Sequence, residues 1–381
     1  MIRRRLFIFL AFTALLNSSA LAPFPARAQT PSPFVTKLVE TLEFTGFIQP
    51  RWEYTNQTNA LPSNSFRLRR AEIGIKPSLN ARIKSTVVAD FVPTALSIKD
   101  VYFDFLLNPK GFFTLRMGQW KKPFSREELR SSSAILMVDR GRMDSALGPS
   151  GLAFLERDMG VAVLGDFYEN HVPFEYQFGI FNGNGNNVNA DTDNWKSYVG
   201  RIEFVPVAGL SIGANFNVND LGVNKASGAA DTLGYPGNQA HFKAKALGVD
   251  AKIQKLGFIL EAEYRSADNW KGGAIGATAA SSIRGKTLIT PGLTTRGVCA
   301  TMVYKATTNN PSVPYVEPGF RVETYDPNTH VANDGSTFIT ICLGIYVHEA
   351  CRFQINAQME RPQDGTKQKI TTVAAQWTVK Y

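Results

Sequence analysis

Apolar and polar residues alternate in many runs of about ten residues, and this pattern favours an all-β fold. The clearest run covers residues 210–219, where each even-numbered residue is apolar and each odd-numbered one is small or polar. Residues 174–180, 258–264 and 353–359 alternate in the same way. After residue 28 the sequence holds no uninterrupted apolar stretch long enough for a membrane-spanning helix, so we expect none.

Alternation fits a soluble sheet as well as a membrane barrel, and two further features favour the barrel. The polar partners include Ser211, Asn215 and Asn217, small or amide residues that suit a water-filled lumen. The last run ends on Tyr381, like the terminal strand of bacterial outer-membrane proteins. Aromatic residues at strand ends resemble the girdles of such barrels: Trp52, Tyr54, Trp120, Tyr198, Trp270 and Trp377.

About sixteen runs are predicted as strands, an even number typical of porin-sized antiparallel barrels. Tight turns alternate with longer segments at 120–157, 183–194, 220–239 and 268–295, as expected for short periplasmic turns and long external loops. The runs lie near residues 42–55, 65–77, 81–91, 99–108, 111–119, 158–168, 172–182, 195–206, 208–219, 240–254, 256–267, 296–306, 317–326, 336–347, 351–361 and 367–381.

The N-terminus predicts export. Three arginines precede an apolar stretch, and Ala26-Arg27-Ala28 has the form of a signal-peptidase site. We therefore interpret residues 1–28 as a signal peptide and residues 29–381 as one barrel domain. Removal of four arginines and no acid lowers the net charge from +9 to +5. The remaining basic residues are spread along the chain and mixed with acids, which argues against a nucleic-acid partner.

Motifs for catalysis and cofactor binding are absent from the sequence. The four histidines are scattered, without the spacing of a metal site or a catalytic triad. We expect neither an enzyme nor a cofactor. Cys342 and Cys351 fall on opposite faces of a predicted hairpin, so we expect no disulfide between them.

Several segments resemble the phosphate-selective and polyphosphate-selective porins of Gram-negative bacteria. They are FRLRRA at 66–71, GQWKKPFSREELRSS at 118–132, RDMG at 157–160 and EPGFR at 317–321. The resemblance implies a sixteen-stranded homotrimer in the outer membrane, with the third loop folded into each pore. It also implies inward-facing arginines and lysines that draw anions through the pore.

The candidate pore-lining and anion-binding residues combine this resemblance with the alternation. Arginine facing lipid is costly, so arginines opposite apolar neighbours should face the lumen, where their planar groups suit phosphate. Alternatively, these arginines pair with Asp100, Asp104, Glu72 or Glu203 and cross-link the wall. The predicted third loop contributes only two lysines at its start, fewer than phosphate-selective members carry. The candidates are Arg67, Arg69, Arg70, Arg116, Lys121, Lys122, Arg126 and Arg201.

The sequence thus predicts an outer-membrane porin for passive diffusion of small solutes, with a bias toward anions. Residues 121–157 include seven basic and five acidic residues, so the excess of positive charge is small. Phosphate and polyphosphate are the candidate anions. A non-selective diffusion porin and a structural or adhesive surface barrel are the alternatives. The expected partners are small anions such as phosphate, membrane lipid, lipopolysaccharide and further copies of the chain.

Overall fold

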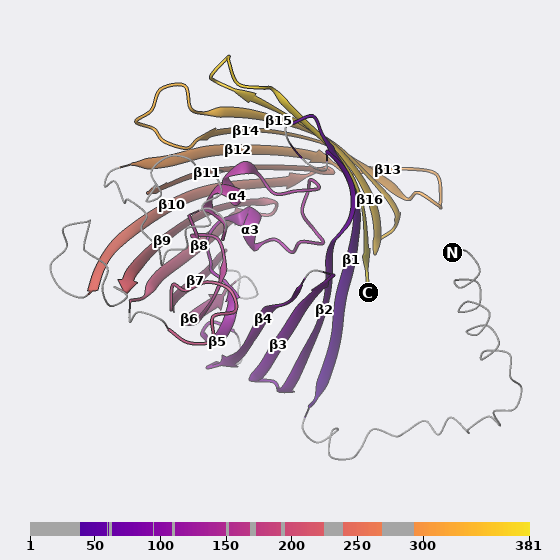
Figure 1. Ribbon diagram of the computed structural model, residues 1–381. Coiled ribbons are helices and arrows are strands. Elements are labelled where there is room, and N and C mark those ends of the chain that lie inside the picture. Colours follow the sequence, from indigo (N-terminus) through magenta and orange to yellow (C-terminus); the bar gives the residue numbers. More distant parts are fainter. Residues whose placement is uncertain are drawn as a thin grey trace, which may run out of the picture. The chain divides into compact units, whose positions relative to one another are not determined.

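The computed structural model shows a closed antiparallel β-barrel built from Thr41–Tyr381, which form one compact unit (Figure 1). The predicted signal peptide and Trp270 lie outside the described residues. Within the described ranges, no helix is both long and apolar enough to cross a membrane. The structure describes residues 39–58, 60, 63–93, 95–108, 111–149, 152–167, 173–191, 195–224, 239–268 and 293–381.

Each strand pairs antiparallel with its neighbours, and β1 pairs with β17 to close the barrel. The two-residue β13 pairs with β14 beyond the end of β12, so β12 and β13 share one of sixteen positions. All sixteen predicted runs overlap observed strands, which confirms the predicted barrel. The elements are β1 (Thr41–Thr55), β2 (Asn64–Asn80), β3 (Ile83–Val92), β4 (Ala95–Leu106), β5 (Thr114–Lys121), α3 (Arg126–Leu129), α4 (Arg142–Leu147), β6 (Arg157–Asp166), β7 (Phe174–Phe181), β8 (Ser197–Val207), β9 (Leu210–Asn224), β10 (Gln239–Lys255), β11 (Phe258–Asp268), β12 (Thr294–Tyr304), β13 (Ala306–Thr307), β14 (Tyr315–Asp326), β15 (Ser336–His348), β16 (Cys351–Pro362) and β17 (Ile370–Lys380).

The wall turns its apolar side chains outward and its polar ones inward. On β9, Ile212 and Phe216 are exposed, whereas Asn215 and Asn217, the two neighbours of Phe216 in the sequence, are buried. In a membrane, lipid covers the exposed apolar face and removes it from water. The alternation predicted from the sequence is therefore a true inside–outside pattern.

The aromatic girdle is correct in part. Tyr54, Tyr198 and Trp377 are exposed on the outer face. Trp120 is only 3% exposed and packs against Phe181, with ring centroids 4.9 Å apart. The prediction that Trp120 belongs to the girdle is wrong. Met117 faces outward on β5, and side chains three residues apart on a strand point to opposite faces, so Trp120 faces inward.

Most two-residue turns lie at one end of the barrel and the longest connections at the other, as predicted; the two-residue connection between β3 and β4 is the exception among the connections whose bounds the structure gives. Leu256 and Gly257 join β10 to β11 with φ values of 52° and 83°. Two positive φ values are the signature of the two-residue turn that matches strand twist. The long connection between β5 and β6 carries α3 and α4.

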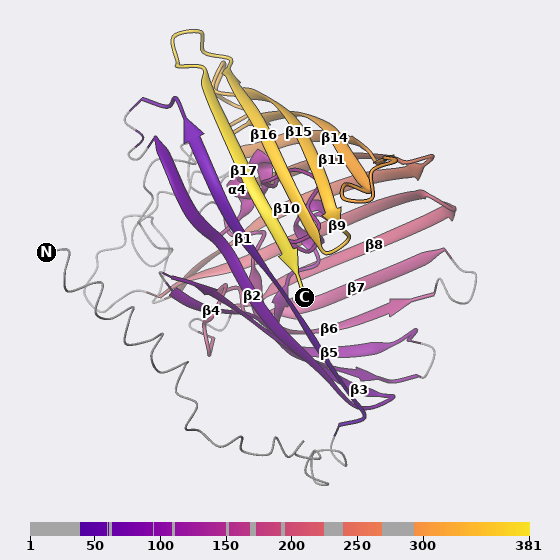
Figure 2. The ribbon, with the colours of Figure 1, turned by 90° about the vertical axis from the view of Figure 1, so that its right-hand side faces the viewer.

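Tyr381 covers the seam where the barrel closes. Its backbone N–H donates to Gly46 O at 3.1 Å, and Gly46 N–H donates to Tyr381 O at 3.0 Å. Its hydroxyl donates to Glu72 O on β2 at 3.2 Å. A Cβ on Gly46 would lie 2.3 Å from the Tyr381 ring, so the glycine makes room for it. Figure 2 shows β17 beside β1 at this seam.

All three cysteines are free thiols. Cys342 is buried on the inner face of β15 and lies near Leu136. Cys351 precedes the buried, inward-facing Arg352 on β16, so its side chain has the opposite orientation.

Candidate functional site

A β-bulge brings two adjacent arginines of β2 to the inner face. Gln49 pairs with Arg70 and Pro50 pairs with Leu68, so Arg69 has no partner on β1. Pro50 has no N–H to donate to the ladder, and an unpaired residue opposite it removes that requirement. Strict alternation would turn Arg70 toward lipid together with Leu68. The bulge reverses this, and Arg70 donates to Gln49 Oε1 at 2.9 Å.

Four arginines, Arg51, Arg67, Arg69 and Arg70, form what we call the arginine cluster. Arg51 binds both Asp139 carboxylate oxygens, at 2.8 and 2.9 Å. Arg67 lies 2.8 Å from Glu53, and Arg69 lies 4.0 Å from Asp139. The Arg67 and Arg69 side chains are 47% and 37% exposed. Two carboxylates among four guanidinium groups leave a positive excess that solutes in the lumen can reach.

The charge of Asp139 is stabilised by this cluster. The surrounding protein would by itself raise the pKa of Asp139, because it removes water from the carboxylate. The positive charges of Arg51, Arg69 and Arg70, with the hydrogen bonds from Arg51, outweigh that effect. The pKa of Asp139 therefore lies below its ordinary value, and the carboxylate stays ionised at neutral pH.

Arg116, Arg126 and Arg201 are held by carboxylates of the wall. Arg116 donates to both oxygens of Asp104, at 2.7 and 2.8 Å. Arg126 Nε donates to Asp250 Oδ1 at 2.6 Å, and Arg201 binds the same carboxylate with both terminal nitrogens. These contacts favour the alternative role of wall cross-links at the three positions.

The two predicted lysines have structural partners as well. Lys121 Nζ donates to Arg130 O at 3.1 Å and lies 3.6 Å from the Glu128 carboxylate. Lys122 is almost fully buried, where its Nζ donates to Ala153 O at 3.0 Å. Lys122 is therefore out of reach of a solute in the lumen.

The connection from Lys122 to Glu156, which we call the inner segment, is bound to inward-facing side chains of the wall. Asn217 on β9 donates to Phe154 O, and Gln354 on β16 donates to Leu136 O. Figure 1 shows α3 and α4 within the ring of strands. The five acidic residues of the inner segment are all in ion pairs: Glu127 with Arg321, Glu128 with Arg140, Asp139 with Arg51, Asp144 with Arg265, and Glu156 with Lys122.

Apolar packing adds to these polar contacts. Phe124, Leu147 and Phe154 of the inner segment are fully buried. Each such side chain contributes about 1.5–3 kcal/mol when removed from water. The wall leaves room for them through small inward-facing residues of β10 and β11, Ala244, Ala246 and Ala267. Sequence analysis did not identify these alanines as the surface on which the segment packs, although the alternation of Ala244 and Ala246 with outward-facing lysines is a signal for it.

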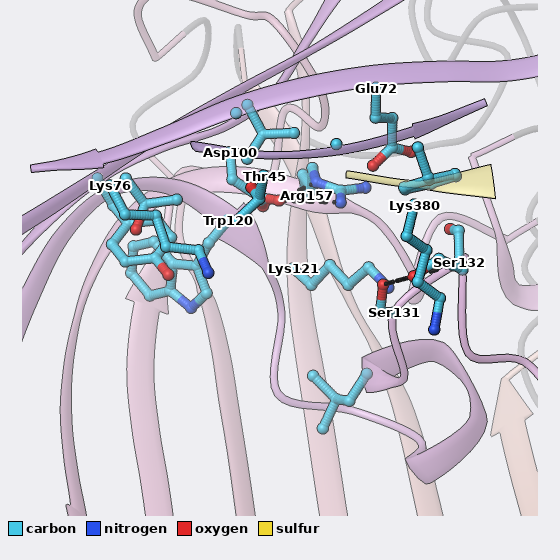
Figure 3. A pocket seen from close by; sticks show the side chains of 18 of the residues that line it. Thr45, Glu72, Lys76, Asp100, Trp120, Lys121, Ser131, Ser132, Arg157 and Lys380 are labelled. Atoms are coloured by element: carbon cyan, nitrogen blue, oxygen red, sulfur yellow. Dashed lines mark hydrogen bonds and ion pairs between the residues drawn. The ribbon is translucent and has the colours of Figure 1, made fainter. Parts of the chain in front are cut away.

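A cavity of about 540 Å³ lies on the other side of the lumen, along β1 to β5 (Figure 3). The inner segment faces it with Leu129, Ser131, Ser132 and Ser133, none of which carries a charge. A second cavity of about 400 Å³ extends along β3 to β8. The first is lined by two acidic side chains, Glu72 and Asp100, and by five basic ones, Lys76, Arg116, Lys121, Arg157 and Lys380.

Three of these basic residues were not among the predicted site residues. Arg157 donates to both Asp100 oxygens, at 2.9 and 3.1 Å, and Lys76 lies 2.7 Å from Glu43. Lys380 points into the cavity and forms no ion pair with the residues that the structure describes. The alternation of β17 was sufficient to find Lys380, since it lies two residues beyond the buried, inward-facing Thr378.

A barrel with lipid-facing apolar side chains and ionic groups around internal cavities is a membrane channel of the porin class. Residues 48–249, just over half of the chain, match the family described as phosphate-selective porin O and P. The chain belongs to this family. It is therefore an outer-membrane channel, as predicted.

Solved porin structures share the fold at low sequence identity, and no curated protein matches the sequence. An anion-selective porin from Comamonas acidovorans is 11% identical, with 90% of this chain and 99% of that chain covered and a TM-score of 0.62. OmpF from Salmonella typhi, in complex with daunomycin, is 11% identical over 91% and 99% of the two chains, with a TM-score of 0.61. OprB of Pseudomonas putida is 9% identical over 93% and 97%, with a TM-score of 0.61.

Proposed function

We propose that this porin conducts small solutes passively with a preference for anions, and that phosphate is among them. One observation carries the proposal: the five carboxylates of the inner segment are paired, and the part of it that faces the larger cavity is neutral. The basic excess of the opposite wall then has no counter-charge across the cavity. An anion in the cavity is attracted, and a cation is repelled.

The arrangement along β2 supports the choice of anion. From the long-connection end of the barrel toward the tight turns, Arg67, Arg69 and Arg70 are followed by Lys76 on the inner face. The planar guanidinium group of arginine can offer two parallel N–H donors to phosphate oxygens. Weak sites in series allow an ion to enter and also to leave. The name of the family and the anion selectivity of the Comamonas acidovorans porin agree with this choice.

A non-selective porin is the second candidate. It is favoured by Arg116, Arg126 and Arg201, whose charges are matched by Asp104, Asp250 and Glu203. Such pairs produce little net field in the lumen. The family and the fold point to a channel rather than an enzyme.

The remaining expectations follow from the same assignment. The inner segment acts as the third loop that narrows the pore, and residues 1–28 direct export. Three copies assemble, as in the trimer form of OmpT, an outer membrane protein of Vibrio cholerae, and the outer face contacts membrane lipid and lipopolysaccharide. Trimer-sized migration of unheated protein, lost after heating, would support the assembly, and a monomer in mild detergent would oppose it.

The reversal potential of the channel in a planar bilayer with a KCl gradient tests the proposal. We expect a sign that corresponds to chloride being more permeant than potassium. Added phosphate should reduce the chloride current if the arginine cluster binds it. A cation-selective reversal potential would reject the anion preference, a value near zero would support the non-selective porin, and an absence of current would support a structural surface barrel.

A further inference from the structure

Carboxyl groups outnumber arginines where the inner segment meets β11 and β14. All six charged groups are at most 8% exposed. Taking ions out of water is costly unless opposite charges and hydrogen bonds compensate. Arg140 adds a third positive charge beside Glu127 and Asp144, but three arginines still cannot neutralise four ionised carboxylates, so this junction favours bound protons. The groups are Glu127, Asp144, Glu263 and Glu323 against Arg265 and Arg321.

The hydrogen bonds locate the missing proton at Glu127 and Asp144. Asp144 Oδ2 accepts from Arg265 at 2.9 Å, but Oδ1 is buried and has no donor among the N–H and O–H groups that the structure describes. The carboxyl groups of Asp144 and Glu127 lie within hydrogen-bonding distance of each other. If Glu127 carries a proton, it can donate to Asp144, and the repulsion between the two acids disappears.

The other oxygen contacts of Glu127 remain available in the protonated form. Arg321 donates to one oxygen, and Gly141 N–H donates to the other at 3.1 Å. Glu263 needs no proton, since it accepts from Ser125 Oγ and from the backbone N–H groups of Arg126 and Glu127. Glu323 accepts from Arg142 N–H, and its Oε2 has no donor in the described part of the chain. Glu323 is therefore the competing position for a proton.

The electrostatic surroundings agree with a proton on Glu127. The pKa of Glu127 is raised to about 8, because burial and the charges of Asp144 and Glu323 together outweigh the attraction of Arg321 and Arg265. Burial would also raise the pKa of Asp144, but Arg265 and the hydrogen bond with Glu127 hold it below its ordinary value. The charged and titratable groups around Glu127 are Asp144 on α4, Arg140 in the inner segment, Glu263 and Arg265 on β11, Cys299 on β12, and Arg321 and Glu323 on β14.

We propose that Glu127 is a positioning residue: a proton shared between Glu127 and Asp144, both in the inner segment, removes their repulsion and lets them contact Arg321 of β14 and Arg265 of β11, so that loss of this proton loosens the segment and alters the pore. The device makes the channel sensitive to pH. It requires that the barrel conducts, which the family assignment supplies, and it does not require a preference for anions. Its failure is therefore distinct from a failure of the proposed selectivity.

The direction of the pH effect follows from the two states of Glu127. In a released segment the carboxyl is in water, with its ordinary pKa of 4.5, whereas in the docked segment its pKa is about 8. The docked state therefore binds more protons between these values. Docking is strongest at low pH, weakens by up to about tenfold per pH unit between 4.5 and 8, and is constant above that.

Single-channel recording between pH 5 and pH 9 at constant KCl concentration tests this proposal. In the unmodified channel, the fraction of time in an altered conductance level should rise with pH and level off above pH 8. Glu127→Gln should remove most of this slope, because the amide keeps a permanent donor toward Asp144. Asp139→Asn is the matched control, since it removes a carboxylate of the inner segment that faces Arg51 instead, and it should keep the slope.

Two outcomes would overturn the proposal: an unmodified channel without a pH slope, or a Glu127→Gln channel that keeps the slope. If the slope is kept in Glu127→Gln but lost in Glu323→Gln, the proton belongs to Glu323. Heat-dependent electrophoretic migration shows whether each variant forms a barrel. If Glu127→Gln does not form one, Asp144→Asn replaces it with an expected decrease of the slope, since its amide removes one of the charges that raise the pKa of Glu127, and an unchanged slope would overturn the proposal.

Discussion

Replacement of Lys380 by glutamine should lower the anion preference of the pore. Lys380 lines the cavity of about 540 Å³ and forms no ion pair with the described residues. A sphere of that volume has a radius of about 5 Å, which is the distance from a central ion to the lining groups. At that distance a unit charge in water contributes about 0.8 kcal/mol.

Salt reduces this interaction by a known amount. At 0.1 M the screening length is about 10 Å, which leaves about 0.5 kcal/mol. Lys380 attracts chloride and repels potassium, so the difference between the two ions is about 1 kcal/mol, or about fivefold in relative permeability. At 1 M the screening length is about 3 Å, and the expected change falls below about twofold.

Reversal potentials of the Lys380→Gln channel at the two salt concentrations measure the effect. Lys243→Gln is the matched control, since Lys243 faces outward on β10 with 59% of its side chain exposed. This control should leave the permeability ratio unchanged. The reasoning is refuted if Lys380→Gln has no effect at 0.1 M, if its effect is equally large at 1 M, or if the control produces the same shift.

Three further predictions concern three arginines of the lumen, Asp139 and the barrel seam. Changing Arg67, Arg69 and Arg116 together to glutamine should lower the anion preference and weaken any block by phosphate, and unchanged reversal potentials would return them to wall cross-links. Asp139→Asn should raise the anion preference at neutral pH. Because the pKa of Asp139 is below its ordinary value, acid should produce the same rise only below about pH 4, and a rise near pH 6 would contradict this. Tyr381→Ser should reduce the yield of heat-modifiable barrel, since it removes the ring over Gly46 and the hydroxyl bond to β2; a normal yield would exclude this role.

The strands could be predicted from the sequence because each one carries its own information. The outer face of every strand contacts lipid and is therefore apolar, whichever strands lie beside it, as Ile212 and Phe216 on β9 illustrate. A pattern with a period of two residues can be recognised without knowing which strands pair. The same local rule also places Lys380 in the lumen, although Lys380 is not among the predicted site residues.

The charges in the lumen could be predicted only in part, because their roles depend on distant residues. Arg70 faces inward as a result of a bulge opposite Pro50 on another strand. Glu127 pairs with Arg321, which lies 194 positions further along the chain. The sequence gives the number of acids and bases between residues 121 and 157, but not which wall residue neutralises each of them. This pairing decides how much of the net charge of the segment acts on ions in the pore.

The docking of the inner segment divides the barrel into two halves with different freedom to change. On the far side, strands β9 to β16 supply many of the partners of the inner segment, so a substitution there needs a matching change to preserve packing and charge. On the near side, strands β1 to β5 line a cavity, and a substitution there leaves the packing of the inner segment against β9 to β16 in place. We therefore expect related channels to differ in their solutes mainly through β1 to β5, and laboratory redesign of permeability to succeed there first.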